Sequence, residues 1–245
     1  MNYGYAPVEP TAPLVVLDAA DEADRYCIQL YAHTLDGVGV AGADVLEVGS
    51  GRGGGASWVS RSLGPRTTTG VDFAGSAVAL SRRDRAGPGL QFVQGDAQAL
   101  PFADGAFDIA CTAFGAIPFV ADSGAVMREV ARVLRPGGSW VFSITHPMRW
   151  IFLDEPGPEG LLAVNSYFDR RPYVEQDGEG VPGYVEQHRT LGDRVRELVG
   201  AGFVLRDLVE PEWPAGHEGI WGQWSPLRGR LFPGTAIFVA DRPGP

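Results

Sequence analysis

Residues 45–58 read VLEVGSGRGGGASW, a short apolar stretch that ends near a carboxylate and runs directly into a glycine-rich turn. Gly49, Gly51 and Gly54 satisfy the G-x-G-x-x-G pattern in which a strand, a tight turn and a helix form a dinucleotide site. Asp72 follows Gly51 by 21 residues, the spacing of the acid that binds a ribose in such sites. The pattern alone therefore leaves nicotinamide or flavin dinucleotides open as ligands.

Two details of this turn favour a different nucleoside. Glu47 places a negative charge where a pyrophosphate would lie, whereas the same charge would attract a ligand with a positive centre. Gly53 adds the tighter G-x-G-x-G spacing, which lets a nucleoside lie close against the backbone. The expected ligand is an adenine nucleoside with a cationic or zwitterionic tail.

Strand and helix patterns alternate along the chain around the glycine turn. Helices of about 10–15 residues between strands imply right-handed crossovers and a parallel sheet that is covered by helices on both faces. The expected fold class is therefore α/β, with a doubly wound, Rossmann-like sheet of seven strands. The expected strands are 43–49, 67–72, 90–96, 107–114, 139–147, 203–211 and 235–241, and the expected helices are 18–37, 54–64, 76–87, 123–138 and 190–202.

The regular alternation stops after Pro147. Residues 147–187 carry prolines, glycines, acids and scattered aromatics without a clear period, and an insertion of that length is usually functional or disordered. Its aromatic residues favour an ordered cap. We expect one domain over 1–245, divided into an N-terminal helical lid (1–40), a nucleoside-binding core (41–146), the cap (147–187) and the end of the sheet (188–245).

Composition excludes several classes of chemistry. The chain has no lysine, so Schiff-base catalysis, a pyridoxal phosphate anchor and a phosphate-binding P-loop lysine are excluded. Its formal charge of −10 disfavours nucleic acid and anionic lipid as partners. Cys27 and Cys111 lie in apolar runs, which suits buried thiols. No apolar run approaches the roughly 18 residues of a membrane span and no signal-like start is present, so a cytoplasmic protein is expected.

Five motifs between about residues 40 and 145 resemble, in order and spacing, those of class I S-adenosylmethionine-dependent methyltransferases. They are LEVGSGRGG, Asp72 after GV, QGDAQALPF, FDIACTAF and VARVLRPGG. The resemblance implies S-adenosyl-L-methionine as cofactor, S-adenosyl-L-homocysteine as product, and an antiparallel last strand at 235–241. It also implies the following cofactor contacts: Glu47, Gly49, Gly51 and Gly53 at the amino acid end, Asp72 with Phe73 at the ribose, and Asp96 with Ala97 at the adenine.

The two parts of the chain resemble different methyltransferases. Residues 1–95 resemble bacterial natural-product O-methyltransferases of the rebeccamycin sugar and phthiotriol type, and residues from about 100 onward resemble another bacterial class I group. The expected acceptor is a hydroxyl of a small secondary metabolite. N- or C-methylation, a nicotinamide-dependent oxidoreductase and a catalytically silent nucleoside-binding module stay open as alternatives, as does a homo-oligomer.

An alcohol acceptor has to lose a proton, and histidine titrates in the useful range. His146 follows the fifth strand and is the first candidate base, with a role in shaping the pocket as the alternative; His33 on the N-terminal helix is the second. His188 and His217 have no metal-ligand spacing, so no metal is expected.

Aromatic residues supply the remaining candidates. Tyr26 and Tyr31 on the N-terminal helix can cover the adenosine, and Phe114 after the fourth strand is expected to face the cofactor or acceptor. An apolar acceptor pocket with aromatic walls is expected from five side chains, namely Trp213, Trp221, Trp224, Tyr167 and Phe168.

Overall fold

The protein is described by a computed structural model that covers residues 4–9, 11–221 and 223–244. A seven-stranded sheet in the order β3-β2-β1-β4-β5-β9-β8 forms its centre. The first five strands are parallel, and β9 is antiparallel to both of its neighbours, β5 and β8. The strands are β1 (Asp44–Val48), β2 (Thr67–Asp72), β3 (Leu90–Gln94), β4 (Phe107–Ala113), β5 (Leu134–Thr145), β8 (Val204–Val209) and β9 (Thr235–Asp241).

This sheet confirms the predicted doubly wound fold and its antiparallel last strand. The last strand does not lie at an edge, because β9 is inserted between β5 and β8. Thr235 at the start of β9 is paired with Thr145 at the end of β5. The start of β9 therefore lies at the carboxyl edge of the parallel strands, where open α/β sheets bind their ligands.

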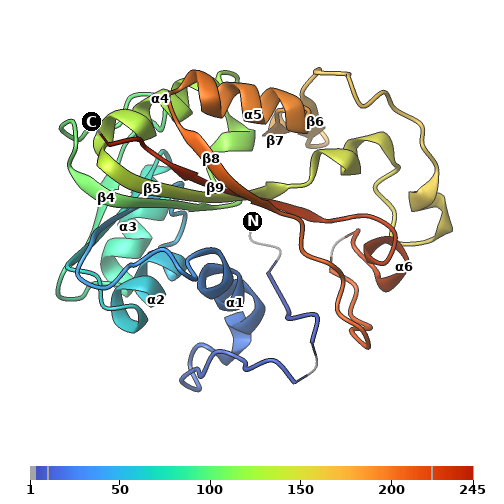
Figure 1. The fold of residues 1–245 in the computed structure, drawn as a ribbon. Coiled ribbons are helices and arrows are strands. Elements are labelled where there is room, and N and C mark those ends of the chain that lie inside the picture. The colour runs from blue at the N-terminus through green and yellow to red at the C-terminus, as the bar shows by residue number, and fades with distance from the viewer. Residues whose placement is uncertain (1–3, 10, 222, 245) are drawn as a thin grey trace.

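Helices cover both faces of the sheet (Figure 1). Three of them, α1 (Arg25–Thr34), α2 (Gly54–Ser62) and α3 (Gly75–Asp84), lie on one face, and α4 (Ser123–Val133) and α5 (Leu191–Gly200) lie on the other. Alternate residues of β1 serve the two layers: Val45 packs with α1 and α2, whereas Leu46 packs with α4. Apolar side chains are thus buried on both sides of the sheet, which explains the continuous apolar runs in its strands.

Two predicted helix boundaries were wrong. The helix predicted over 18–37 begins only at Arg25, after a short 3-10 turn at Glu22–Asp24. The helix predicted over 123–138 ends at Val133, and the Pro-Gly-Gly sequence that follows belongs to β5. There Gly137 adopts φ +84° and the pairing register with β4 shifts, so the glycines form a β-bulge.

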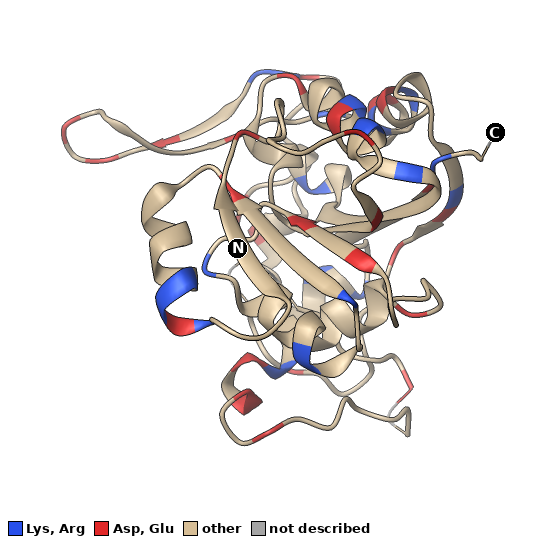
Figure 2. Cartoon of the chain, turned by 90° about the vertical axis from the view of Figure 1, so that its left-hand side faces the viewer, with Lys and Arg blue, Asp and Glu red and all other residues tan. Residues whose placement is uncertain are grey.

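The cap contains ordered elements. They are two 3-10 helices, η3 (Pro147–Ile151) and η4 (Pro158–Leu161), and a hairpin of β6 (Tyr173–Gln176) with β7 (Pro182–Glu186). Two further short elements complete the fold, η2 (Ile117–Phe119) and α6 (Pro226–Gly229). In the described ranges, no helix is long and apolar enough to cross a membrane. Acidic and basic residues are intermixed along the helices and loops (Figure 2), with 30 acids against 20 bases in the whole chain.

Candidate active site

The glycine turn between β1 and α2 requires glycine at two positions for different reasons. Gly49 has φ +78°, and a Cβ atom there would lie 2.7 Å from the backbone nitrogen of Ala116. Gly53 has φ +73°, and a Cβ atom there would lie 2.6 Å from the ring of Phe92. Since other residues rarely adopt such φ values, both positions combine a conformational with a steric requirement. The turn brings backbone close to the segment after β4.

A cleft of about 440 Å³, which we call the glycine-turn cleft, opens at the carboxyl ends of β1, β2 and β3. This volume lies in the range of small-molecule sites, about 300–1,000 Å³. The cleft is lined by Gly49, Val71, Asp72, Phe73, Gly95, Asp96, Ala97, Gln98, Ala116, Phe119, Val120 and Ala121. Five residues predicted to contact the cofactor are therefore brought together here: Gly49, Asp72, Phe73, Asp96 and Ala97.

The two acids of the cleft are held by backbone amides. Asp72 accepts hydrogen bonds from the amide nitrogens of Gly51 (2.7 Å) and Ala74 (2.9 Å). Asp96 accepts one from the amide of Gln98 (2.8 Å). Beside Asp72, the side chain of Phe73 is 76% exposed, which is unusual for a phenylalanine and leaves its ring face available at the cleft. The cleft thus presents two oriented carboxylates and an aromatic surface.

Glu47 lies beneath the turn and is almost completely buried, with 1% of its surface exposed. Burial raises the pKa of its carboxyl to about 7, although the Tyr31 hydroxyl and the Ala56 amide favour the charged form. Its Oε2 atom has no hydrogen-bond partner in the part of the chain that the structure describes. A buried carboxyl with one unsatisfied oxygen is costly, so this position is suited to a cationic ligand.

Tyr31 is the partner of Glu47. Its hydroxyl donates a hydrogen bond to Oε1 of Glu47, and its ring is buried against α2. The sequence predicted Tyr31 only as a cover for the adenosine, because nothing in the local pattern shows which residue a helix side chain meets 16 positions away.

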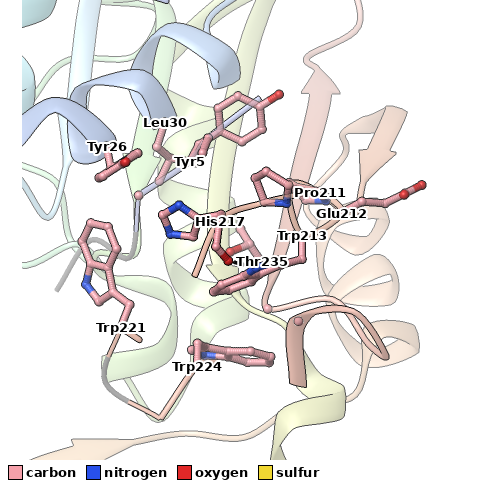
Figure 3. A pocket seen from close by; sticks show the side chains of 15 residues that line it. Tyr5, Tyr26, Leu30, Pro211, Glu212, Trp213, His217, Trp221, Trp224 and Thr235 are labelled. Carbon is pink, nitrogen blue, oxygen red and sulfur yellow. Dashed lines mark hydrogen bonds between the residues drawn. The ribbon is translucent and has the colours of Figure 1, made fainter. Parts of the chain in front are cut away.

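A second cavity, which we call the aromatic cavity, has a volume of about 100 Å³. It lies between the N-terminal segment (residues 4–6), α1 and residues from 211 to 235 (Figure 3). Tyr26 lies edge-on to His217 and Trp221, with ring centroids 5.5 and 5.6 Å apart. The cavity is lined by Gly4, Tyr5, Ala6, Tyr26, Leu30, Pro211, Glu212, Trp213, Pro214, His217, Trp221, Trp224, Gly229, Gly234 and Thr235. The three predicted tryptophans therefore share one cavity.

Several predicted site residues lie elsewhere. Tyr26 lines the aromatic cavity and not the glycine-turn cleft. Phe114 lines neither cavity, because its ring is buried in a small core with Leu30 and Ile237. Tyr167 and Phe168 line neither the aromatic cavity nor the glycine-turn cleft. The ring of Tyr167 instead packs edge-on against His188.

The two candidate bases are occupied by structural contacts. His146 is buried, its Nδ1 accepts the amide of Met148 (3.1 Å) and its Nε2 lies 2.7 Å from Oε1 of Glu210. Burial lowers the pKa of His146, and Glu210 opposes that shift. With both nitrogens engaged, His146 caps η3 and anchors the segment after β8. His33 stacks on Tyr5 at 3.9 Å, and burial lowers its pKa.

The sequence led us to consider His217 only as a metal ligand and not as a group that meets the acceptor. It lines the aromatic cavity, and its backbone oxygen accepts a hydrogen bond from the Trp213 indole (2.9 Å), which fixes the loop. Its ring lies among the labelled side chains in the centre of Figure 3. No cluster of three or more His, Cys, Asp or Glu suited to a metal is found among residues 4–9, 11–221 and 223–244.

Comparisons with known proteins show to which family the chain belongs. The family model described as a methyltransferase domain matches residues 46–142. The fatty-acid O-methyltransferase of Mycolicibacterium smegmatis is 42% identical over 217 residues, which cover 88% of this chain and 75% of that protein. The chain belongs to the class I S-adenosylmethionine-dependent methyltransferases.

A second relative and one solved structure are also similar to this methyltransferase. The probable phthiotriol/phenolphthiotriol dimycocerosates methyltransferase 2 of Mycobacterium ulcerans is 40% identical over 152 residues, 60% of this chain. The chain spans only 56% of that relative's length. A crystal structure of an S-adenosylmethionine-dependent methyltransferase from Mesorhizobium loti matches with a TM-score of 0.71 and 23% identity, covering 87% of this chain and 96% of that one. That likeness shows the shared fold.

The cleft of this methyltransferase fits its cofactor, S-adenosyl-L-methionine. The cleft has the volume of a small-molecule site and carboxylates at two strand ends, and the buried Glu47 with its unsatisfied oxygen lies in β1 two residues before Gly49 of the lining. When bound, the cofactor supplies a methyl group on a positively charged sulfur. The protein's task is then to align an acceptor, exclude water and, for an alcohol, remove a proton.

Proposed function

We propose that this methyltransferase transfers the methyl group to an oxygen of a small, largely apolar natural-product or lipid acceptor whose reacting end lies in the aromatic cavity. The observation that carries the proposal is the cavity itself, because three tryptophans and Tyr26 surround a histidine at the carboxyl edge of the sheet. Apolar walls with a few polar groups are typical of sites for such molecules. Support also comes from the relative at 42% identity, which is named an O-methyltransferase.

The cofactor is proposed to occupy the glycine-turn cleft. Asp72 would bind the ribose hydroxyls, and Asp96 with Ala97 would hold the adenine beside Phe73. Glu47 would pair with the ammonium of the amino acid part. These roles follow the family resemblance, and the convergence of Asp72, Phe73, Asp96 and Ala97 on one cleft supports theirs.

His217 is proposed as the group that meets the acceptor. In contrast to His146, no described residue bonds its ring nitrogens, and the ring lies within the lining of the aromatic cavity. For a hydroxyl acceptor, a neutral imidazole there would take up the proton as the oxygen gains the methyl group. A carboxyl acceptor, which the name of the M. smegmatis relative favours, is already ionised at neutral pH and needs no base.

The size of the aromatic cavity limits what it encloses. Its volume of about 100 Å³ is below the roughly 300 Å³ of a typical small-molecule site, so it accommodates the reacting end and not a long chain. A longer acceptor would have to extend between the N-terminal segment and the 211–235 region, which meet at Gly4 and Trp221.

The test is a methyl-transfer assay with isotopically labelled S-adenosylmethionine on matched C12 acceptors: a fatty acid, a primary alcohol and a primary amine. We expect an ether or ester product identified by mass spectrometry, and no N-methyl product. Trp221→Ala should lower kcat/KM at least tenfold, while Phe168→Ala, an exposed aromatic outside both cavities, should leave it within twofold. Methylation of the amine alone, or equal effects of both variants, would overturn the proposal.

A further inference from the structure

Helix α1 contributes to both cavities from different sides. Tyr26 and Leu30 line the aromatic cavity, whereas Tyr31 bonds to Glu47 beneath the glycine turn. The same helix holds the N-terminal segment that lines the aromatic cavity. The backbone amide of Tyr5 donates to the carbonyl oxygen of Tyr26 (2.9 Å), and Nε2 of the Gln29 side chain donates to the carbonyl oxygen of Tyr5 (2.9 Å). A change in how α1 packs would therefore be felt in both places.

The contact of Tyr31 with the glycine turn is closely fitted. A Cβ atom on Gly55 would lie 2.0 Å from the Tyr31 ring, so this glycine is needed for the approach of the tyrosine and not for its own backbone conformation. Gly55 lies in the first turn of α2, directly after the glycine turn. The fit brings the Tyr31 hydroxyl to Oε1 of Glu47 and leaves Oε2 without a partner in the described chain.

We propose that Tyr31 is a positioning residue, which holds Glu47 so that Oε2 is presented to the ammonium group of the cofactor, and that α1 thereby couples cofactor binding to the formation of the aromatic cavity. The carboxyl is buried and hydrogen-bonded on one side, so it is held in one orientation. An ammonium is a donor that can satisfy the second oxygen with a charge-assisted hydrogen bond.

The coupling follows from the charge balance at Glu47. Without a cation beside it, an ionised Glu47 is unfavourable in this buried place, and the carboxyl is a poorer acceptor for Tyr31 when it is protonated. A bound ammonium favours the ionised carboxylate and so strengthens the Tyr31 hydrogen bond. The helix that carries Tyr31, Tyr26 and Leu30 should then be held more firmly. The coupling rests on the proposed pairing of Glu47 with the cofactor ammonium; it does not rest on the proposed acceptor or on the role proposed for His217.

The first test compares two ligands that differ at the amino acid end. S-adenosylhomocysteine carries the ammonium, whereas 5′-methylthioadenosine retains the nucleoside and lacks the amino acid part. By calorimetric titration, Tyr31→Phe should lower the affinity for S-adenosylhomocysteine at least fivefold. The affinity for 5′-methylthioadenosine should stay within twofold of the wild-type value. Tyr173→Phe removes a hydroxyl that donates to Glu175 on the exposed hairpin (2.9 Å) and is the matched control, with both ligands unchanged.

A second variant covers the case in which Tyr31→Phe fails to fold. Glu47→Gln keeps an acceptor for Tyr31 and removes the charge, so it should show the same selective loss. If the affinities for both ligands fall equally in either variant, or if neither affinity falls, Tyr31 and Glu47 do not act on the ammonium and the proposal is wrong.

The second test reads the coupling by amide hydrogen exchange, without any acceptor. Saturating S-adenosylhomocysteine should slow exchange in α1 and in residues 4–9 of the wild type by at least threefold. Saturating 5′-methylthioadenosine, or S-adenosylhomocysteine with Tyr31→Phe, should give less than half of that protection. Equal protection in all three cases would overturn the coupling. A failure of the C12 acceptor panel would leave these results unaffected, so the two proposals fail separately.

Discussion

The carboxylate of Asp72, at the end of β2, accepts a hydrogen bond from the backbone amide of Gly51 at 2.7 Å, so the ribose-binding candidate and the glycine turn form one unit. The same carboxylate accepts the Ala74 amide, which fixes its second oxygen. The pair explains how residues 21 positions apart can present a common surface to a nucleoside.

Loss of the Asp72 carboxylate should weaken binding of the cofactor. We expect Asp72→Ala to reduce affinity for S-adenosylhomocysteine by about 1–3 kcal/mol, because charge-assisted hydrogen bonds to the ribose hydroxyls are lost. Titration calorimetry measures the change, with NAD as a control ligand that should not bind. Asp72→Asn, which keeps one acceptor oxygen, should lose less. Affinity unchanged in Asp72→Ala would remove Asp72 from the ribose site.

The convergence of the candidate cofactor residues could be predicted from local pattern and sheet geometry. Gly49, Asp72 and Asp96 each follow a parallel strand, and the carboxyl ends of neighbouring parallel strands meet at one edge. Their convergence therefore requires no knowledge of side-chain packing. The bulge at Gly137 was missed because a Pro-Gly-Gly sequence ends a helix and starts an irregular strand equally well.

The contacts that sequence reasoning could not predict depend on how distant segments pack. His146 meets Glu210, 64 positions later, and that contact occupies the nitrogen a base would need. Tyr31 meets Glu47 because of the angle at which α1 packs on the sheet, and His217 enters the aromatic cavity because of the path of an irregular loop. Neither the packing angle nor the loop path has a local signature.

The buried Glu47 should make the stability of the cofactor-free protein depend on pH. Folding raises its pKa from the ordinary 4.5 to about 7, so the stabilising contribution is present below about 4.5 and is lost as pH rises through 7. Tyr31, Asp72 and Cys111 are the titratable groups that interact with it. Glu47→Gln removes the penalty, and we expect it to be about 1–3 kcal/mol more stable than the wild type at pH 8.

Urea unfolding at pH 5 and pH 8 measures this difference. The advantage of Glu47→Gln should shrink to less than about 1 kcal/mol at pH 5, where the wild-type carboxyl is protonated in the folded state. Gain in stability with loss of cofactor affinity would be a trade-off between stability and function. A variant that is less stable than the wild type at pH 8 would contradict a costly buried charge at this position.

The start of α5 supplies a pH effect of the opposite sign. Asp193 forms a capping box with Thr190, and it pairs with Arg170 (2.7 Å) and Arg196 (2.6 Å). Although partial burial raises its pKa, the hydrogen bonds from Arg196, Thr190 and Arg170 outweigh this and lower it to about 2. The stabilisation is therefore complete above about pH 4 and is lost as pH falls towards 2.

Asp193→Asn should lower the free energy of unfolding by about 1 kcal/mol at pH 7, the usual value of a helix cap. As pH falls from 4 towards 2, the difference between the variant and the wild type should shrink, as measured by urea unfolding across the pH range. The same substitution at Asp207, an exposed residue of β8, serves as the control and should change stability by less than about 0.5 kcal/mol. A difference that is as large at pH 2 as at pH 7 would show that the charge is not its origin.

His146 and His217 should give opposite patterns when each is replaced by alanine. His146→Ala removes the cap of η3 and the link to Glu210, so we expect a loss of about 1–3 kcal/mol in stability and a pH profile of kcat/KM with unchanged midpoints. His217→Ala removes a partly exposed ring, so it should cost less than about 1 kcal/mol and lower kcat at least tenfold with an alcohol acceptor. With a carboxylate acceptor the effect on kcat should be smaller, because no proton has to be removed.

Thermal melting measures the stability of the two variants, and steady-state kinetics measure their kcat and kcat/KM. If His146→Ala folds with wild-type stability yet loses its activity, His146 is the base after all, and the hydrogen bond to Glu210 orients it for that role.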